Sequence, residues 1–238
     1  MVEADYNLAP GALRDGAIKP PTETEQQSFL LTEHLVTATR PGSIQTESFR
    51  ALRSNLQAQH VSRGRRALAI CSPTAEAGCS FVAANLAFVM AQAGVKTLLI
   101  DGNLRAPGVQ AFVSSSDYGP GLGECLADDT LPLASAIKRV QPSLSVLFAG
   151  NAGIASADRL GSSVFRGLIA QCMRDFDLTI VDTPPSSQSA DARRIAAVTH
   201  YALVVTRRDK TFVKDVRVLL DELSADGAEA IGTYLNDF

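Results

Sequence analysis

A short glycine-containing segment between a predicted strand and a predicted helix has residue types suited to binding phosphate. In it, Gly78 is followed by Cys79 and Ser80, and a helical pattern then continues to Gly94. Loops of this kind hold phosphate oxygens with backbone N–H groups and the helix N-terminus, while a lysine after the glycine reaches the phosphates and a hydroxyl holds Mg²⁺. Ser80 supplies the hydroxyl, but Cys79 stands where the lysine is needed. The residues predicted to bind phosphate are Thr74, Ala75, Glu76, Ala77, Gly78, Cys79, Ser80 and Phe81.

Two carboxylates are expected beside this loop. Asp101 and Asp182 each end an apolar run that is predicted to be a strand. In an α/β sheet, ligands bind at the carboxyl ends of the strands, and a carboxylate placed there can face a metal-bound phosphate. The loop 71–81 and the two acids therefore predict one shared site for phosphate and Mg²⁺.

The elements that position this site are predicted from short runs rich in apolar and β-branched residues. The runs are 67–70, 96–101, 143–148, 178–182, 201–206 and 230–235. Most are separated by helical stretches, and they are largely apolar on both faces, as in parallel strands that helices cover on both sides. The sequence therefore predicts an α/β fold with a doubly wound, mainly parallel sheet flanked by helices.

The first part of the chain differs in composition from the rest. Residues 1–42 are rich in proline, glycine and polar residues without a sustained apolar period, which predicts a flexible N-terminal arm. Residues 43–60 contain neither glycine nor proline, and their apolar residues recur at helical spacing. These apolar residues are Ile44, Phe49, Leu52 and Leu56. An amphipathic helix is predicted there, as the first element of a single domain spanning 43–238.

Composition narrows the classes of function. The 238 residues carry a formal net charge of −3 and no block of like charges, which argues against nucleic-acid binding. No run of about 18 apolar residues occurs, and the N-terminus lacks the basic, apolar start of a secretory signal. We therefore expect a cytoplasmic protein without a membrane span of its own. Cys71, Cys79, Cys125 and Cys172 lack CxxC spacing and are expected to be reduced thiols.

Several motifs make the sequence resemble the bacterial tyrosine kinases, cytoplasmic autokinases that pair with chain-length or polymerisation regulators in capsule and exopolysaccharide assembly. The family motif Asp-x-Asp-x-Arg is matched by Asp101, Asn103 and Arg105, and Asp-x-Pro-Pro by Asp182, Pro184 and Pro185. The family's helix signature Glu-x-x-Arg-x-x-Arg is matched by Glu47, Arg50 and Arg53. The last strand, with Asn236, is also similar, so the resemblance runs from about residue 43 to the end of the sequence.

The resemblance implies a P-loop NTPase-like fold with a site for ATP or ADP and Mg²⁺. Arg105 is implied as a further phosphate-binding residue, and Asp101 as the residue with residual catalytic character. The implied metal ligands are Ser80, Asp101, Asn103 and Asp182.

The resemblance also implies partners. Glu47, Arg50 and Arg53 would form the contact of a cyclic homo-oligomer, whereas their spacing alone is equally compatible with a simple Glu47–Arg50 pair within one helix. The other implied partner is a separate inner-membrane protein, a polysaccharide chain-length regulator or co-polymerase. The protein would then be recruited from the cytoplasm to the inner face of the membrane.

Three departures from the family pattern predict a pseudokinase with weak or lost nucleotide binding. Cys79 replaces the lysine, and Asn103 replaces an aspartate that would face Mg²⁺. The sequence also ends at Phe238 without the family's tyrosine cluster, and Tyr234 is expected to be a partly buried strand residue and not a phosphate acceptor. Phosphoryl transfer depends on positioning and electrostatic stabilisation, so loss of a cation and an acid acts on the mechanism directly.

Three alternatives remain open at this point. An active tyrosine autokinase would need a cation from elsewhere, such as Arg105 or a neighbouring subunit. A partition-type ATPase would carry an extra lysine where the sequence has Thr74. Finally, Cys79 at a helix N-terminus would be a reactive thiolate if its pKa were lowered.

Overall fold

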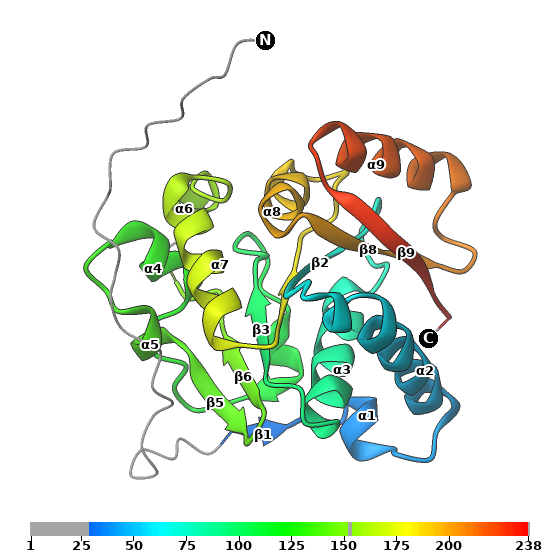
Figure 1. Ribbon diagram of the computed structural model, residues 1–238, viewed down its shortest axis with the longest axis horizontal. Coiled ribbons are helices and arrows are strands. Elements are labelled where there is room, and N and C mark those ends of the chain that lie inside the picture. The colour runs from blue at the N-terminus through cyan, green and yellow to red at the C-terminus, as the bar shows by residue number, and fades with distance from the viewer. Residues whose placement is uncertain (1–28, 152–153, 238) are drawn as a thin grey trace.

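A seven-stranded sheet forms the centre of the protein, whose computed structural model describes residues 29–151 and 154–237 (Figure 1). The strands lie in the order β5-β6-β3-β7-β2-β8-β9, and neighbouring pairs are parallel except β5 with β6. Their bounds are β2 (Ala67–Cys71), β3 (Thr97–Asp101), β5 (Lys138–Gln141), β6 (Leu144–Leu147), β7 (Leu178–Asp182), β8 (Tyr201–Arg207) and β9 (Glu229–Asn236). The six predicted strands are all present, and the doubly wound, mainly parallel sheet is confirmed.

Helices cover both faces of this sheet (Figure 1). One face carries α1 (Val36–Thr39), α2 (Ile44–Gln59) and α3 (Cys79–Gln92). The other carries α4 (Leu122–Ala127), α5 (Leu133–Ala136), α6 (Ile154–Ala157), α7 (Ser163–Asp175), α8 (Asp191–Thr199) and α9 (Val213–Ala225). The described elements also include the 3-10 turns η1 (Val61–Arg63) and η2 (Val109–Ala111) and a small ladder of β1 (Leu30–Leu31) with β4 (Val113–Ser114).

Strand β2 shows why the strands are continuous apolar runs in the sequence. All five of its residues are buried. Ala67, Ala69 and Cys71 pack into the cluster on one face of the sheet, while Leu68 and Ile70 pack into the cluster on the other. Alternate side chains of a strand point to opposite faces, so a strand covered on both sides is apolar at every position.

The segment 29–42 is packed on the domain, although its composition places it in the predicted flexible arm. Leu35 is 1% exposed, and the backbone N–H and hydroxyl of Thr37 both donate to Asn85 Oδ1 of α3, at 3.0 and 2.9 Å. The prediction of flexibility is therefore wrong for 29–42, because the few residues that anchor it are too short a run to show a period. Residues 1–28 of that arm lie outside the described residues.

Helix α2 confirms the predicted amphipathic element, with one correction. The Ser43 hydroxyl caps it by accepting from the Thr46 backbone N–H at 3.2 Å, which satisfies one of the free donors of the first turn. Phe49 and Leu56 are buried as expected, but Ile44 is 84% exposed and does not belong to the packed face. Position 44 is the first residue of the helix, where the chain has not yet reached the core.

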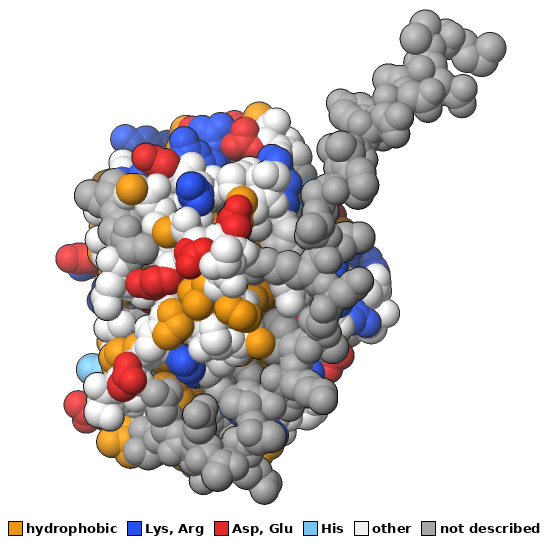
Figure 2. Space-filling model, turned by 90° about the vertical axis from the view of Figure 1, so that its left-hand side faces the viewer, with side chains coloured by type: hydrophobic (Ala, Val, Ile, Leu, Met, Phe, Trp, Pro, Cys, Tyr) orange, Lys and Arg blue, Asp and Glu red, His pale blue; other side chains and the backbone are white. Residues whose placement is uncertain are grey.

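The cysteines and the lengths of the helices can be compared with the expectations from composition. Cys71, Cys79, Cys125 and Cys172 are free and buried. No helix within 29–151 and 154–237 is both long and apolar enough to cross a membrane. Figure 2 shows the end of the molecule on the α4 and α5 side, where acidic and basic side chains both occur across the visible face.

Candidate phosphate-binding site

The loop between β2 and α3 has the backbone form that a phosphate-binding loop requires. Gly78 caps α3 with φ at 91°, a left-handed conformation that favours glycine. A Cβ at Gly78 would lie 2.3 Å from Asn236 Nδ2, and that amide donates to the Ala77 carbonyl oxygen at 2.9 Å. The end of β9 therefore seats the loop, which is a structural role for the asparagine noted in the sequence.

Cys79 is the first residue of α3, in the position where a lysine would reach phosphate. Its side chain is buried, and burial, followed by the nearby Asp182 carboxylate, raises the pKa of the Cys79 thiol well above its ordinary value. The hypothesis of a reactive thiolate is therefore wrong, because it needs a lowered pKa and burial and the Asp182 charge raise the pKa instead. Cys79 is a buried, neutral side chain.

Ser80 and the two predicted acids come together at the carboxyl ends of β2, β3 and β7. The Ser80 hydroxyl donates to Asp182 Oδ2 at 2.5 Å, and Asp101 is the cross-strand partner of Asp182 in the parallel ladder of β3 with β7. Asp101 accepts the backbone N–H groups of Asn103, Gly108 and Val109 at 3.0 to 3.1 Å. The three predicted residues thus form one buried polar cluster.

Gly108 belongs to this cluster, although no motif identified it. A Cβ at this position would lie 2.4 Å from Ser80 Oγ and 3.7 Å from Asp182 Oδ2. Only a residue without a side chain allows the 102–108 loop to approach Ser80 so closely. Gly108 therefore sets how tightly the β3 loop closes over the acids.

The arrangement of the acids fits a cation. Both carboxylates are fully buried, and Asp182 Oδ1 has no hydrogen-bond partner among the described residues. Burial raises the pKa of Asp101 to about 6 despite its three N–H donors, and burial together with the Asp101 charge raises the pKa of Asp182 well above its ordinary value. Mg²⁺ is commonly held by one or two carboxylates with phosphate oxygens and water. Ser80 and Asp182 are the residues that would hold it here.

We predict that Asp182→Asn stabilises the metal-free protein. Both acids have folded pKa values above their unfolded values, so the stability present at low pH is lost as the pH rises through the folded pKa, which is about 6 for Asp101. At about pH 8 in the presence of a chelator, the free energy of unfolding should rise by roughly 1–3 kcal/mol, and the gain should vanish near pH 4. Urea denaturation measures this, with Asp221→Asn on the exposed face of α9 as control. A variant no more stable than the parent at about pH 8 would contradict the assignment.

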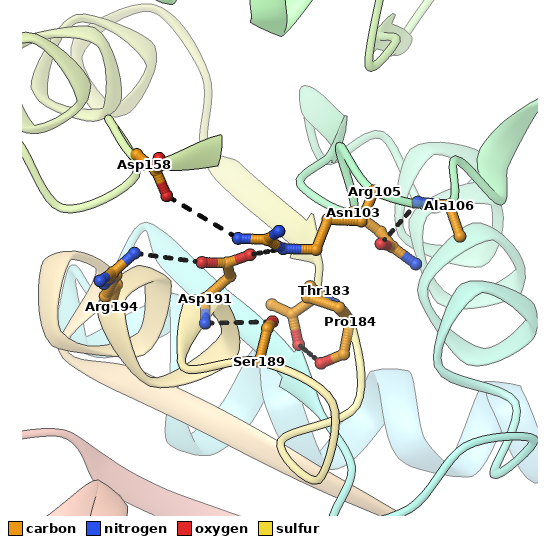
Figure 3. Close-up of polar contacts among 9 residues, drawn as sticks. All are labelled: Asn103, Arg105, Ala106, Asp158, Thr183, Pro184, Ser189, Asp191 and Arg194. Carbon is orange, nitrogen blue, oxygen red and sulfur yellow. Dashed lines mark hydrogen bonds and ion pairs between the residues drawn. The ribbon is translucent and has the colours of Figure 1, made fainter. Parts of the chain in front are cut away.

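Arg105 and Asn103 are placed differently from the phosphate and metal roles implied for them (Figure 3). The Arg105 guanidinium points to Asp191, with Nε 2.7 Å from Oδ2, and lies 3.9 Å from Asp158. Asp191 is buried and also pairs with Arg194 at 3.3 Å. The Asn103 side-chain oxygen accepts the Ala106 backbone N–H at 3.1 Å. Arg105 thus ties the β3 loop to α8, and Asn103 shapes its own turn.

Two cations that the sequence patterns did not indicate lie against the loop. Arg207 Nη1 donates to the Glu76 carbonyl oxygen at 2.9 Å, and Lys210 Nζ donates to Glu76 Oε2 at 2.8 Å. Arg207 ends β8, which pairs in parallel with β2, and Lys210 follows it. Neighbouring parallel strands end at the same edge of a sheet, so the basic residues at the end of the 201–206 run were the available signal.

The remaining loop residues and Tyr234 have mainly structural contacts. The Thr74 hydroxyl lies 3.4 Å from the Thr211 hydroxyl, and the Phe81 ring packs against Phe49 with centroids 5.7 Å apart. Phe81 can therefore contribute only its backbone to a ligand. Tyr234 is 8% exposed, stacks on Phe49 and shares a hydrogen bond with Ser48, as its expected burial requires.

The implied contact residues lie together on α2. Glu47 and Arg50 form an ion pair within the helix, and their side chains are 62% and 37% exposed. Arg53 Nε is buried without a hydrogen-bond partner among the described residues. An unsatisfied donor beside an exposed charged pair is compatible with a contact to another molecule.

Comparison with known proteins decides the family. No protein-family model matches the chain. The tyrosine-protein kinase YwqD of Bacillus subtilis is 30% identical over 211 residues, which are 87% of this chain and 86% of YwqD. The chain belongs to the bacterial tyrosine kinase family. Its partition-type alternative is thereby set aside.

Two further similarities extend this result. The kinase domain of the Escherichia coli tyrosine kinase ETK superposes with a TM-score of 0.79 at 28% identity, covering 85% of this chain and 79% of that one. The succinoglycan biosynthesis transport protein ExoP of Rhizobium meliloti is 29% identical over 199 residues, 82% of this chain. The chain spans only 25% of ExoP's length. The bacterial tyrosine kinase domain is thus found both in relatives of similar length and in much longer ones.

Proposed function

We propose that this bacterial tyrosine kinase homologue is a pseudokinase of exopolysaccharide polymerisation and export. The observation that carries the proposal is the neutral, buried Cys79 at the first position of α3, where the family requires a cation. Phosphoryl transfer is catalysed almost entirely by positioning and charge stabilisation, so this position bears directly on turnover. Asn103 stands where the family pattern has a carboxylate, so the β3 loop also carries one negative charge fewer than that pattern.

The retained scaffold supports weak binding of ATP or ADP with Mg²⁺. The backbone of the Gly78 loop and the N-terminus of α3 favour an anion, and the Ser80–Asp182 pair favours a cation beside it. Bound Mg²⁺ would neutralise phosphate charge. The protein's own residues would hold and orient the ligand. The Asp101 carboxylate accepts three backbone N–H groups, so it is poorly placed to accept a proton from a substrate.

The proposed action is assembly. The protein would act in the cytoplasm at the inner face of the membrane, as a homo-oligomer bound to a polysaccharide chain-length regulator or co-polymerase. Support for this comes from membership of the family and from the succinoglycan transport role in the name of ExoP. Further support comes from the charged stripe on α2, which consists of Glu47, Arg50 and Arg53. If the site is folded but does not turn over ATP, a partner can still respond to the conformation of the site and to whether nucleotide is bound.

A calorimetric titration of the purified protein with Mg-ATP tests the retained scaffold. The loop offers backbone dipoles without the lysine, and a charged hydrogen bond contributes about 1.5–3 kcal/mol. We therefore expect a Kd weaker than about 0.1 mM. Micromolar or tighter binding would contradict the proposal and would favour an active autokinase.

A further inference from the structure

We propose that Lys210, supported by Arg207, supplies the cation for phosphate at the 74–80 loop that position 79 lacks, and that Glu76 holds Lys210 beside the loop until an anion displaces it. This inference deepens the proposed function and rests on it, since it concerns the same nucleotide site. The ligand class is a nucleoside polyphosphate with Mg²⁺.

Two cations from the end of β8 lie against the loop. The loop 72–81 contains one charged residue, the acid Glu76. Lys210 Nζ and Arg207 Nη1 both contact that residue, one at its carboxylate and one at its carbonyl oxygen. Two positive groups from the end of β8 therefore lie at a loop whose own sequence provides none.

The turn that carries Lys210 is fixed to the loop by other contacts. The Thr211 hydroxyl accepts the Arg207 backbone N–H at 3.0 Å and lies 3.4 Å from the Thr74 hydroxyl. Arg207 holds the Glu76 carbonyl oxygen directly. Loss of the Glu76–Lys210 ion pair would thus leave Lys210 still next to the loop.

Lys210 is easily released from Glu76. Its side chain is 50% exposed, and that of Glu76 is 71% exposed. Ion pairs between such exposed side chains are weak, because water and salt screen them. A phosphate with two charges, seated at the N-terminus of α3, attracts an ammonium group more strongly than one solvated carboxylate does.

Asp182 gives an independent sign of the ligand. Asp182 Oδ1 is buried, has no hydrogen-bond partner among the described residues, and belongs to the side chain that holds Ser80. A buried carboxylate oxygen without a donor fits a cation, and a polyphosphate brings Mg²⁺ with it. The site thus has Asp182 for the metal and Lys210 for the anion.

The test is equilibrium titration with Mg-ADP, followed by calorimetry or by a fluorescent ADP analogue. Lys210→Ala should weaken the affinity about tenfold or more, since a charged hydrogen bond to phosphate is lost. Glu76→Gln should strengthen it about two- to fivefold, because Lys210 no longer has a competing partner. Lys214→Ala is the matched control: its ammonium group lies 5.5 Å from the Phe212 ring and forms no ion pair with a described residue, so the affinity should not change.

A combined variant sharpens the test. In a Cys79→Lys background, Lys210→Ala should cost much less than in the parent, because two cations that serve the same phosphate are not additive. Equal affinities of the parent and Lys210→Ala, or the absence of any Mg-ADP binding by the parent at millimolar concentration, would overturn the inference. Detection of autophosphorylation would instead overturn the pseudokinase proposal and leave the role of Lys210 standing, so the two failures are distinct.

Discussion

Replacing Cys79 with lysine is expected to raise the affinity for Mg-ATP by about 10- to 100-fold. The substitution returns a phosphate-reaching cation to the first position of α3, and a charge-assisted hydrogen bond to phosphate contributes roughly 1.5–3 kcal/mol. The loop around it already has the required form, with Gly78 in the left-handed conformation and Ser80 beside Asp182. Calorimetric titration of both proteins under the same conditions measures the change.

Cys79→Ala is the matched control for this substitution. It removes the thiol from the same buried position without adding charge, so its affinity for Mg-ATP should equal that of the parent. If Cys79→Lys binds Mg-ATP no more tightly than Cys79→Ala does, then the loop differs from a functional phosphate-binding loop in its geometry as well as in the missing lysine. Circular dichroism of both variants separates that outcome from a loss of folding, since position 79 is buried.

Changing both Arg50 and Arg53 to alanine is expected to dissociate the proposed homo-oligomer into monomers while the fold survives. Each copy of a cyclic interface would lose two charged donors, and the loss is repeated at every contact of the ring. Within the monomer the cost is small, because Arg50 forms only an exposed pair with Glu47 and Arg53 Nε has no partner among the described residues. Phe49 and Leu56 keep α2 in place.

Sedimentation velocity at matched concentration and modest salt measures this effect, together with the thermal midpoint of each protein. A double variant with Arg63→Ala and Arg166→Ala removes the same two charges from other exposed positions and should leave the assembly intact. A parent protein that is strictly monomeric when concentrated, or an Arg50→Ala/Arg53→Ala protein with an unaltered mass distribution, would leave this stripe as an ordinary solvated helix face.

The sequence alone predicts six strands because their runs are rich in apolar residues, and every residue of β2, β3 and β7 is buried between the helices on the two faces. Strand β9 is predicted from the same kind of run although most of its residues are partly or fully exposed at the edge of the sheet. Strand β5 was not predicted, because it has no such apolar run. Lys138, Arg139 and Gln141 are polar, and the strand is partly exposed because it pairs antiparallel at the edge of the sheet with β6 only. The packing of segment 29–42 was not predicted for a different reason. The residues that attach it to the domain, Leu35 and Thr37, are single positions in a run whose composition resembles a linker.

The candidate site could be predicted as far as its members lie in local motifs. Ser80, Asp101 and Asp182 are each adjacent to a strand end, and the structure brings them together as the sheet topology requires. Lys210 and Arg207 contact the loop across more than 130 residues of sequence, so only their position at the end of the 201–206 run could have indicated them. Arg105 matches a family motif, yet its guanidinium points to the buried carboxylate of Asp191. This pairing could not be predicted from the sequence, because the two residues come together only in the folded structure.

The central claim is that this member of the family does not transfer phosphate, and an autophosphorylation assay with radiolabelled ATP and Mg²⁺ tests it most directly. The purified protein is incubated alone, with Ser80→Ala as the background control, because this variant removes the hydroxyl that bonds to Asp182. We expect no phosphotyrosine above that background, because the first position of α3 carries the neutral Cys79 and so offers no charge to stabilise the transferred phosphate from that position. Time-dependent incorporation of label on tyrosine in the parent, absent from Ser80→Ala, would contradict the account and identify an active kinase.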